Sequence, residues 1–296
     1  MVDMHMHTFY SDGDKSLEDV LKKCEDKKLE YISITDHNTC RGYEDECLKN
    51  NIYTGKIVIG AEMNATLDDG KRIEFLAYNI KNPNIINEWS DKFYSYEILK
   101  ERFDRDKNKI IDICNNNGLI YSQDLLKKEI PVTDFFVVYM YYELIKHEEN
   151  LKIMGECAES FNDFRRDGLA NPNSIFYMGE DTSEKPMFRD VADIIHKAGG
   201  LVFLAHPFEY KFEDTIGFID YLRKEIKLDG VECFHPSAEI ENRIDLLLDY
   251  ARKNNLYISG GSDFHGDKKP NNDIGIGSGS LSISKEYIEE WAEIIN

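Results

Sequence analysis

The sequence lacks long apolar runs, and this absence argues against a membrane-spanning helix. No stretch approaches the roughly 20 consecutive apolar residues that such a helix needs. The opening segment MVDMHMHTFYSDG also has neither the basic nor the apolar region of a secretory signal. We therefore expect a cytoplasmic protein that has no membrane partner.

Closely spaced cysteine pairs are missing as well. The six cysteines form no CxxC motif and no dense framework; they are Cys24, Cys40, Cys47, Cys114, Cys157 and Cys233. Because intracellular thiols are kept reduced, we expect free cysteines rather than disulfide bonds.

Positive charge is scarce. The chain has 36 Lys and Arg against 56 Asp and Glu, which gives a formal net charge of −20. Such a surface repels nucleic-acid backbones and anionic membranes at long range, so we expect no long nucleic acid as a partner. A small anionic substrate is compatible with this charge only if bound cations reverse the field within the site.

Short apolar strands alternate with amphipathic helices over both ends of the chain, which favours parallel strands joined by helical crossovers. Strands are expected at 2–6, 31–35, 57–63, 73–79, 201–205, 230–234 and 256–259. One helix is expected to begin at Ser16, where the segment up to Asp19 resembles a capping box. Further helices are expected at about 41–48, 187–197, 216–226, 240–254 and 285–295.

The middle of the chain differs in composition. It is rich in charged and aromatic residues and has few strand signals, and long helical patterns cover Tyr96–Asn116 and 135–147. We interpret it as a mostly helical insertion at 85–185. Residues 1–84 and 186–296 would then form one metal-binding, barrel-like domain.

Metal-type side chains follow six of the expected strands at the point where each strand ends. The segments are VDMHMHTFYSDG, ISITDHNT, IVIGAEMN, VFLAHP, GVECFHP and LYISGGSDFHG. In a parallel barrel these ends lie on one face, where loops converge without disturbing the core. The sequence therefore predicts that these side chains meet at one site.

The residue types in these segments suit a cluster of divalent metals. Imidazoles that alternate along a strand point to the same side and can bind one ion together. Carboxylates can bridge two cations and offset the repulsion between them. The candidate ligands are His5, His7, Asp12, His37, Glu62, His206, Asp263 and His265.

Three histidines have other interpretations. His235 also lies at a strand end, and it is either a ligand or substrate contact or a residue of the turn. His147 is expected at a solvated helix end. His196 is expected just before a helix C-terminus, where a cation favours the helix dipole.

Together, HMHTFYSDG, ITDHNT, GAEMN, LAHP and GGSDFHG resemble, in the same order, the motifs of the polymerase and histidinol phosphatase (PHP) family. The pattern is most similar to small bacterial members that are 3′,5′-nucleoside bisphosphate phosphatases or related exoribonucleases. The resemblance implies an α/β fold, a distorted (β/α)7 barrel, with two to three divalent metals (manganese, iron or zinc) at the strand ends.

The resemblance also implies how the ligands are shared. His5, His7, Glu62 and Asp263 would hold a first metal. The second metal would share Glu62 and use His206. Asp12, His37 and His265 would hold a third, with Asp36 orienting its neighbours.

Two departures from the family pattern affect the site. Family members usually carry a histidine after the bridging glutamate, and here Glu74 takes its place. A carboxylate is a harder ligand, which favours manganese or magnesium; alternatively Glu74 is a solvated strand residue. The usual Arg-Pro-His stretch of the insertion is also absent, which leaves Arg165, Arg166, Lys185 and Arg189 as candidate phosphate contacts.

The implied activity is hydrolysis of a phosphomonoester of a nucleotide or another small metabolite. Asp12, Asp263 or His265 would move protons. No nucleophile elbow and no Walker-type loop is present, and the glycine-rich segment 275–279 reads as a turn. The alternatives are a 5′-3′ exonuclease on short oligonucleotides, a histidinol phosphatase, and a non-catalytic regulatory protein that binds metal.

Overall fold

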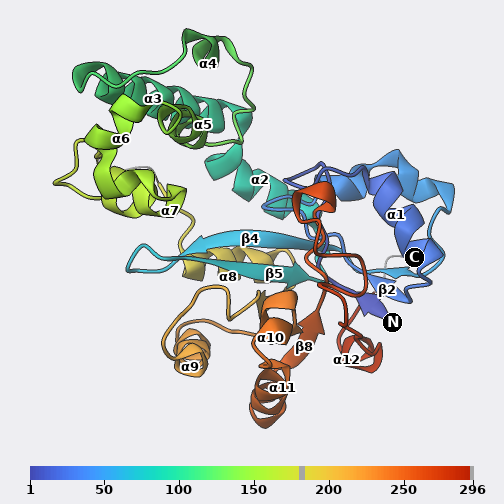
Figure 1. Ribbon diagram of the computed structural model, residues 1–296. Coiled ribbons are helices and arrows are strands. Elements are labelled where there is room, and N and C mark those ends of the chain that lie inside the picture. Colours follow the sequence, from blue (N-terminus) through green and yellow to red (C-terminus); the bar gives the residue numbers. More distant parts are fainter. Residues whose placement is uncertain (180–183, 294–296) are drawn as a thin grey trace. The chain divides into compact units, whose positions relative to one another are not determined.

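The computed structural model describes residues 1–179 and 184–293 (Figure 1). The chain divides into two compact units, Met1–Asp91 with Lys185–Asn296, and Lys92–Glu184. We call them the strand unit and the helical unit. Within the described residues, no helix is long and apolar enough to cross a membrane. The six cysteines are free thiols, as expected.

The strand unit contains two sheets. The first pairs β1 (Val2–Asp3), β2 (Tyr31–Ile32) and β3 (Lys56–Ile57) in parallel. The second has the order β4 (Gly60–Thr66), β5 (Arg72–Tyr78), β6 (Leu201–Leu204), β7 (Gly230–Phe234) and β8 (Tyr257–Gly260). This arrangement confirms the α/β class, and it divides the strand expected at 57–63 between the two sheets.

Strand direction in the second sheet differs from the expectation. β5 runs antiparallel to both β4 and β6, whereas β6, β7 and β8 are parallel. A tight turn joins β4 to β5, in which the Leu67 N–H donates to the Lys71 carbonyl at 2.8 Å. The expectation of parallel strands is wrong at this point because a parallel pair needs a long crossover, and this connection is too short for one.

Backbone hydrogen bonds join the two sheets at both edges. Asn38 lies in the segment after β2, and its N–H donates to the carbonyl of Glu62 in β4 at 2.7 Å. At the other edge the His7 N–H donates to the Phe264 carbonyl at 2.9 Å. The described strands therefore form two sheets joined at both edges, and the joints lie next to the candidate ligands.

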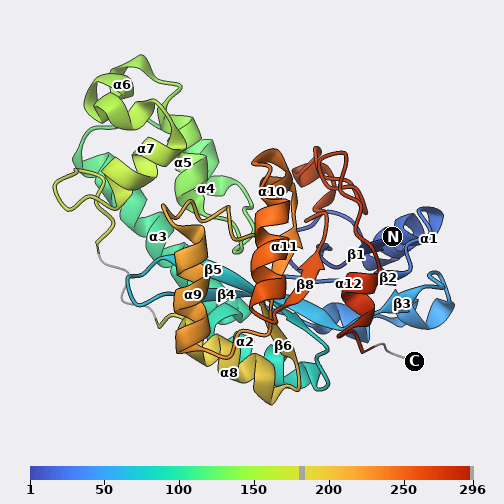
Figure 2. The ribbon, with the colours of Figure 1, turned by 90° about the horizontal axis from the view of Figure 1, so that it is seen from below.

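Helices of the strand unit pack along these sheets. α1 (Leu17–Asp26) begins as predicted, with Ser16 Oγ accepting a hydrogen bond from the Asp19 N–H at 3.1 Å. α8 (Phe188–Lys197) packs against β4, β5 and β6, and α11 (Ile244–Lys253) against β7 and β8. Figure 2 shows these two helices and α9 (Thr215–Glu225) alongside the strands.

Three expected helices have a different extent. The segment 41–48 forms two 3-10 helices, because Asp45 is extended and its side chain accepts a hydrogen bond from the Cys47 N–H. The expected helix 240–254 is the shorter α11, and a separate helix, α10 (Pro236–Ile240), precedes it. The expected closing helix 285–295 is the shorter α12 (Glu286–Glu289), and residue 295 lies outside the described residues.

The chain after α12 is fixed to both sheets by Trp291. Its indole N–H donates to the Ile258 carbonyl at 2.9 Å, and its ring centroid lies 5.0 Å from that of Tyr78. The Tyr78 hydroxyl donates to the Met4 carbonyl at 2.9 Å. These buried contacts link β8, β5 and the segment that follows β1.

The helical unit has its own core. α2 (Pro83–Tyr94) leads into it, and α3 (Tyr96–Asn116) packs on α5 (Phe136–Leu144). Phe136, Phe164 and Phe176 are buried in this core. The remaining short helices of the unit are α4 (Gln123–Lys127), α6 (Glu148–Met154), α7 (Phe161–Asp163), the 3-10 helix Gly155–Ala158 and the π-helix Phe164–Leu169.

Candidate metal centre

The residues after β1 direct two imidazoles toward one point. His5 and His7 are separated by one residue, so their side chains project to the same side of the extended backbone. Their Nε2 atoms lie 3.1 Å apart, and both side chains are buried. The intervening Met6 packs instead in the apolar core that includes Leu17 of α1.

Two carboxylates complete this first group. Glu62 in β4 places Oε2 3.2 Å from the Nε2 atoms of both histidines. Asp263, which follows β8, places Oδ1 3.7 Å from His5 Nε2 and 3.6 Å from His7 Nε2. Ligand atoms about 2.1 Å from a tetrahedral ion lie roughly 3.4 Å from one another. The observed spacings therefore suit one divalent metal.

A second group forms at the other oxygen of Glu62. Glu62 Oε1 lies 2.8 Å from His206 Nε2, and the same nitrogen lies 3.2 Å from Glu74 Oε2. His37 Nδ1 lies 3.4 Å from Glu62 Oε2 and 3.9 Å from Glu74 Oε1. The structure thus brings Glu74 beside the glutamate that was expected to bridge two metals.

Asp12, His37 and His265 form a third group. Asp12 Oδ1 lies 3.2 Å from His265 Nε2, and Asp12 Oδ2 lies 3.7 Å from His37 Nε2. Nδ1 of His7 lies 3.6 Å from Asp12 Oδ1. His7 therefore has one ring nitrogen in the first group and the other in the third. We call the nine residues of the three groups the ligand cluster.

Hydrogen bonding around His5 indicates that the ligand cluster fits cations. Nδ1 of His5 lies 2.8 Å from the buried carboxylate of Glu232. A neutral His5 that donates through Nδ1 has only a lone pair at Nε2, and that lone pair faces Glu62 Oε2. Nδ1 of His37 is also buried and has no hydrogen-bond partner among the described residues. Burial opposes the charge of His5, yet the carboxylates of Glu232 and Glu62 raise the pKa of His5 well above its ordinary value. The converging acceptors therefore favour a cation, whether a proton or a metal ion.

Sequence reasoning missed Glu232. Its Oε2 accepts a hydrogen bond from the His206 N–H at 2.8 Å, so one carboxylate orients ligands on two strands. Burial opposes the charge of this carboxylate, but the charge of His5 holds the pKa of Glu232 below its ordinary value. The available signal was a charged residue inside the apolar strand GVECF.

Burial and charge set the protonation of the central residues. Burial lowers the pKa of His7 to about 3, so its imidazole is neutral at neutral pH and can donate a lone pair to a metal. Burial opposes the charge of Glu62, yet His5 and His37 hold the pKa of Glu62 well below its ordinary value. The ligand cluster thus places the neutral nitrogen of His7 beside the ionised oxygen of Glu62, which suits divalent metals.

The backbone is strained at two ligand positions. His206 has φ 22° and Asp263 has φ 53°, conformations that residues with a side chain rarely adopt. Such strain costs about 1–3 kcal/mol and persists where the surrounding structure imposes it, often at functional sites. Hydrogen bonds of the adjoining backbone impose it here, since the His206 N–H is held by Glu232 and the Asp263 N–H donates to the His5 carbonyl at 2.9 Å.

Asp36 faces the loop after β1 rather than the ligand cluster. Its Oδ1 accepts hydrogen bonds from the Thr8 N–H at 2.8 Å and from the Ser11 hydroxyl at 2.6 Å. Its Oδ2 accepts one from the Thr8 hydroxyl at 2.7 Å. These bonds hold the loop that carries Asp12, so Asp36 orients the third group without belonging to it.

Comparison with protein families matches residues 3–259 to the PHP domain. The chain belongs to the PHP domain family. The matched stretch includes every residue of the ligand cluster except Asp263 and His265, which follow directly after it.

Curated relatives and solved structures agree with this family. The chain is 20% identical to phosphoribosyl 1,2-cyclic phosphate 1,2-diphosphodiesterase of Eggerthella lenta, over 89% of this chain and 94% of the relative. It is 22% identical to a 5′-3′ exoribonuclease of Haemophilus influenzae, over 89% of each. A predicted metal-dependent phosphoesterase of Bifidobacterium adolescentis has a similar fold, with a TM-score of 0.63 and 22% identity over 98% of this chain and 94% of the other. An amidohydrolase of Chromobacterium violaceum also has a TM-score of 0.63, with 19% identity over 93% and 90% of the two chains.

The arginines expected as phosphate contacts of this PHP domain have other partners or belong to the other unit. Arg189 pairs with Asp68 at 2.9 Å and with Glu225 at 2.5 Å on the surface of the strand unit. Arg165 and Arg166 belong to the helical unit, where Arg166 pairs with Asp163 and Asp167. None of these arginines makes an ion pair with the ligand cluster among the described residues.

A lysine that sequence reasoning missed does contact the ligand cluster of the PHP domain. Lys269 Nζ lies 2.5 Å from Asp263 Oδ2. His235, for which the sequence left two interpretations open, is buried, and its Nε2 lies 3.4 Å from the same oxygen. No sequence motif distinguishes Lys269, which lies in a charged loop after the DFHG motif.

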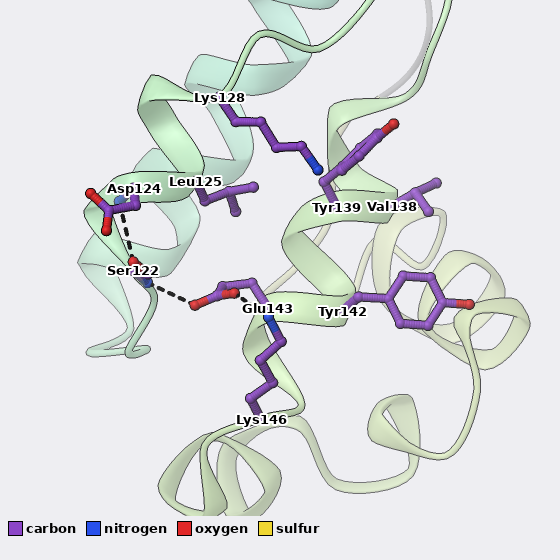
Figure 3. Close-up of a pocket in the computed structure, with 9 residues that line it drawn as sticks. All are labelled: Ser122, Asp124, Leu125, Lys128, Val138, Tyr139, Tyr142, Glu143 and Lys146. Atoms are coloured by element: carbon purple, nitrogen blue, oxygen red, sulfur yellow. Dashed lines mark hydrogen bonds and ion pairs between the residues drawn. The ribbon is translucent and has the colours of Figure 1, made fainter.

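The helical unit has a hollow of its own, between α4 and α5 (Figure 3). Lys128 and Lys146 lie on opposite sides of it, with Tyr139 and Tyr142 along α5. Glu143 accepts hydrogen bonds from the Ser122 N–H and from Lys146 within this hollow. It contains none of the clustered histidines and carboxylates of the strand unit, so it is not the metal centre.

Proposed function

We propose that the chain is a phosphatase that hydrolyses a phosphomonoester of a nucleotide or another small metabolite. The broader class is metal-dependent phosphoesterase, a hydrolytic enzyme of PHP type. The finer proposal includes two to three divalent metals, manganese, iron or zinc, held by the ligand cluster at one end of a distorted barrel.

One observation carries this proposal. Glu62 divides its two oxygens, with Oε1 beside His206 and Oε2 beside His5 and His7. A carboxylate in this position can bridge two cations a few ångströms apart. Paired cations at about 3.5–4 Å are typical of hydrolases that stabilise both the attacking and the leaving oxygen of phosphorus.

The residues of the chain have definable roles in such a reaction. Bound divalent metals would offset the charge on the phosphoryl oxygens and lower the pKa of a water molecule. Asp12 is half-exposed and lies beside His265, so this pair can exchange protons with solvent. Asp263 and Glu62 orient the buried imidazoles, and the low pKa of His7 keeps that ring neutral throughout. The acidic surface disfavours long polymers. A small anionic substrate can bind where cations offset this charge within the site.

Phosphate release under manganese tests the proposal. The protein, purified without chelators, is supplied with 4-nitrophenyl phosphate and with a panel of nucleoside monophosphates, nucleoside bisphosphates and histidinol phosphate. The proposal expects metal-dependent release that disappears with a chelator and returns with manganese. Release from none of these monoesters by metal-loaded protein would contradict it.

An exonuclease on short oligonucleotides is the second candidate. The exoribonuclease of Haemophilus influenzae among the relatives favours it. A labelled 5-nucleotide RNA that is shortened from its 5′ end, with slow hydrolysis of every monoester, would decide for this candidate. Histidinol phosphatase activity would appear in the panel above, and metal binding without any hydrolysis would indicate a regulatory protein.

A further inference from the structure

The two carboxylate oxygens of Asp263 have different neighbours. Its Oδ1 faces the first group of the ligand cluster, at 3.7 Å from His5 Nε2 and 3.6 Å from His7 Nε2. Its Oδ2 faces away from these imidazoles, at 2.5 Å from Lys269 Nζ and 3.4 Å from His235 Nε2. Two nitrogen donors therefore meet at the edge of the ligand cluster.

The proton of His235 can be assigned from its contacts. Nδ1 accepts a hydrogen bond from the Ser237 N–H at 3.1 Å, so in the neutral ring the proton belongs to Nε2. The side chain is 1% exposed, and Nε2 has no hydrogen-bond partner within the described part of the chain. The nearest acceptor, Asp263 Oδ2, lies 3.4 Å away, so a closer ligand oxygen would satisfy this buried donor better.

Lys269 is placed to reach both the ligand cluster and solvent. Its side chain is 43% exposed, while its ammonium group lies against the buried Asp263. Its segment is anchored, because the Asn272 N–H donates to the Lys269 carbonyl at 2.9 Å and the Asn272 amide lies 3.4 Å from the Asp263 carbonyl. Among ion pairs between described residues, Lys269 is the one lysine or arginine that reaches the ligand cluster.

A phosphomonoester needs such a cation in this protein. The dianion must approach a chain of net charge −20 and a cluster that contains several carboxylates. A lysine acts toward phosphate as a compact point charge. Because a phosphomonoester dianion carries one more negative charge than a diester, the lysine favours the monoester. The arginines that the sequence suggested for this role are not paired with the ligand cluster.

We propose that Lys269 and His235 bind the substrate phosphate, Lys269 Nζ and His235 Nε2–H each donating to a phosphoryl oxygen, and that Lys269 selects a terminal phosphomonoester over a diester. This inference rests on the proposed function, because it assumes that phosphate binds at the ligand cluster. Lys269 is then a specificity-determining contact that the family motifs do not include.

Lys269→Met tests the inference, with Lys268→Met as the matched control, since Lys268 is the exposed residue directly before it, at the end of the 3-10 helix Gly266–Lys268. Each variant is assayed for manganese content, for kcat/KM on 4-nitrophenyl phosphate and bis(4-nitrophenyl) phosphate, and for inorganic phosphate binding by calorimetry. We expect Lys269→Met to lose about 10- to 100-fold in phosphate affinity and in kcat/KM for the monoester. The diester should lose much less, metal content should stay unchanged, and Lys268→Met should match the wild type.

Equal losses on both esters, or unchanged phosphate affinity, would overturn the inference. A fall in metal content that parallels activity would also overturn it, because Lys269 would then act only by positioning Asp263. Should the wild type hydrolyse neither ester, the proposed function fails. The calorimetric comparison of phosphate binding still decides whether Lys269 contacts phosphate.

Discussion

Glu62 Oε1 lies 2.8 Å from His206 Nε2, while Glu62 Oε2 lies 3.2 Å from the imidazoles of the neighbouring group. One carboxylate thus joins two sets of ligands that come from strands far apart in the sequence. Its depressed pKa keeps it ionised at neutral pH although it is buried. The proposed metal centre depends on this shared residue more than on any other.

Glu62→Gln should remove metal from both groups that share this side chain. The amide keeps the shape but presents one N–H₂ donor to an imidazole and has no charge to balance the cations. We expect elemental analysis to show loss of most bound metal and phosphate release to fall by more than about 100-fold. The control is Glu213→Gln, an exposed glutamate of the same unit, and full metal content in Glu62→Gln would argue against a bridging role.

Glu74 offers a test of metal preference. If it is a ligand, Glu74→Ala should lose metal beside His206, whereas Glu74→His should keep the ligand number and move the preference from manganese toward zinc, because imidazole is softer than carboxylate. Metal content and activity are measured with each ion supplied in turn. Wild-type behaviour of Glu74→Ala would mean that Glu74 is only a partly solvated strand residue.

Glu232 should affect metal affinity without touching metal. Glu232→Gln weakens the bond that orients His5 and removes a negative charge behind it, so we expect a loss of about 10- to 100-fold in manganese affinity. Competition with a fluorescent chelator measures this affinity, and circular dichroism checks that the variant is folded. An unchanged manganese affinity in a folded variant would show that Glu232 does not support metal binding.

A pH-dependent contribution to stability is expected from Asp229, outside the metal centre. Its buried carboxylate accepts hydrogen bonds from the Val202 N–H and from His196. Burial opposes its charge, but His196 and the Val202 N–H hold the pKa of Asp229 below its ordinary value. Asp229→Asn should therefore lower the free energy of unfolding by about 1–3 kcal/mol at neutral pH.

The sign of this pH dependence follows from the direction of the shift. A carboxylate whose pKa is lower in the folded chain stabilises it fully above the unfolded pKa of about 4, and this contribution disappears as the pH falls through the folded value. The gap between wild type and Asp229→Asn in urea unfolding should thus be constant above about pH 5 and shrink below about pH 4. Asp249→Asn, at an exposed position, should show no gap, and a gap for Asp229→Asn that grows in acid would refute the assignment.

Local sequence patterns predicted the parts of the site that depend on one strand end. Alternation placed His5 and His7 on one side, and the structure brings Glu62 and Asp263 to them as the convergence of strand ends requires. The Ser16 cap was likewise a local feature. Strand direction was not predictable in the same way, because a period of two residues is identical in parallel and antiparallel pairs.

Contacts made by single residues remained hidden. Glu232 and Lys269 reach the ligand cluster through the fold rather than through a motif, so neither spacing nor composition distinguished them from surface charges. Arg189 had the right charge for a phosphate contact, but the fold pairs it with Asp68 and Glu225. Only the tertiary structure distinguishes residues that reach the ligand cluster from surface charges.

The decisive measurement on the metal centre is the metal content of the His37→Ala variant. His37 lies between the second and third groups, and His147→Ala in the helical unit is the matched histidine control. In protein purified without chelators, we expect about two to three equivalents of divalent metal in the wild type and in the control, and about one fewer in His37→Ala. Less than about one equivalent in the wild type, with no uptake of added manganese, would contradict a polynuclear hydrolase.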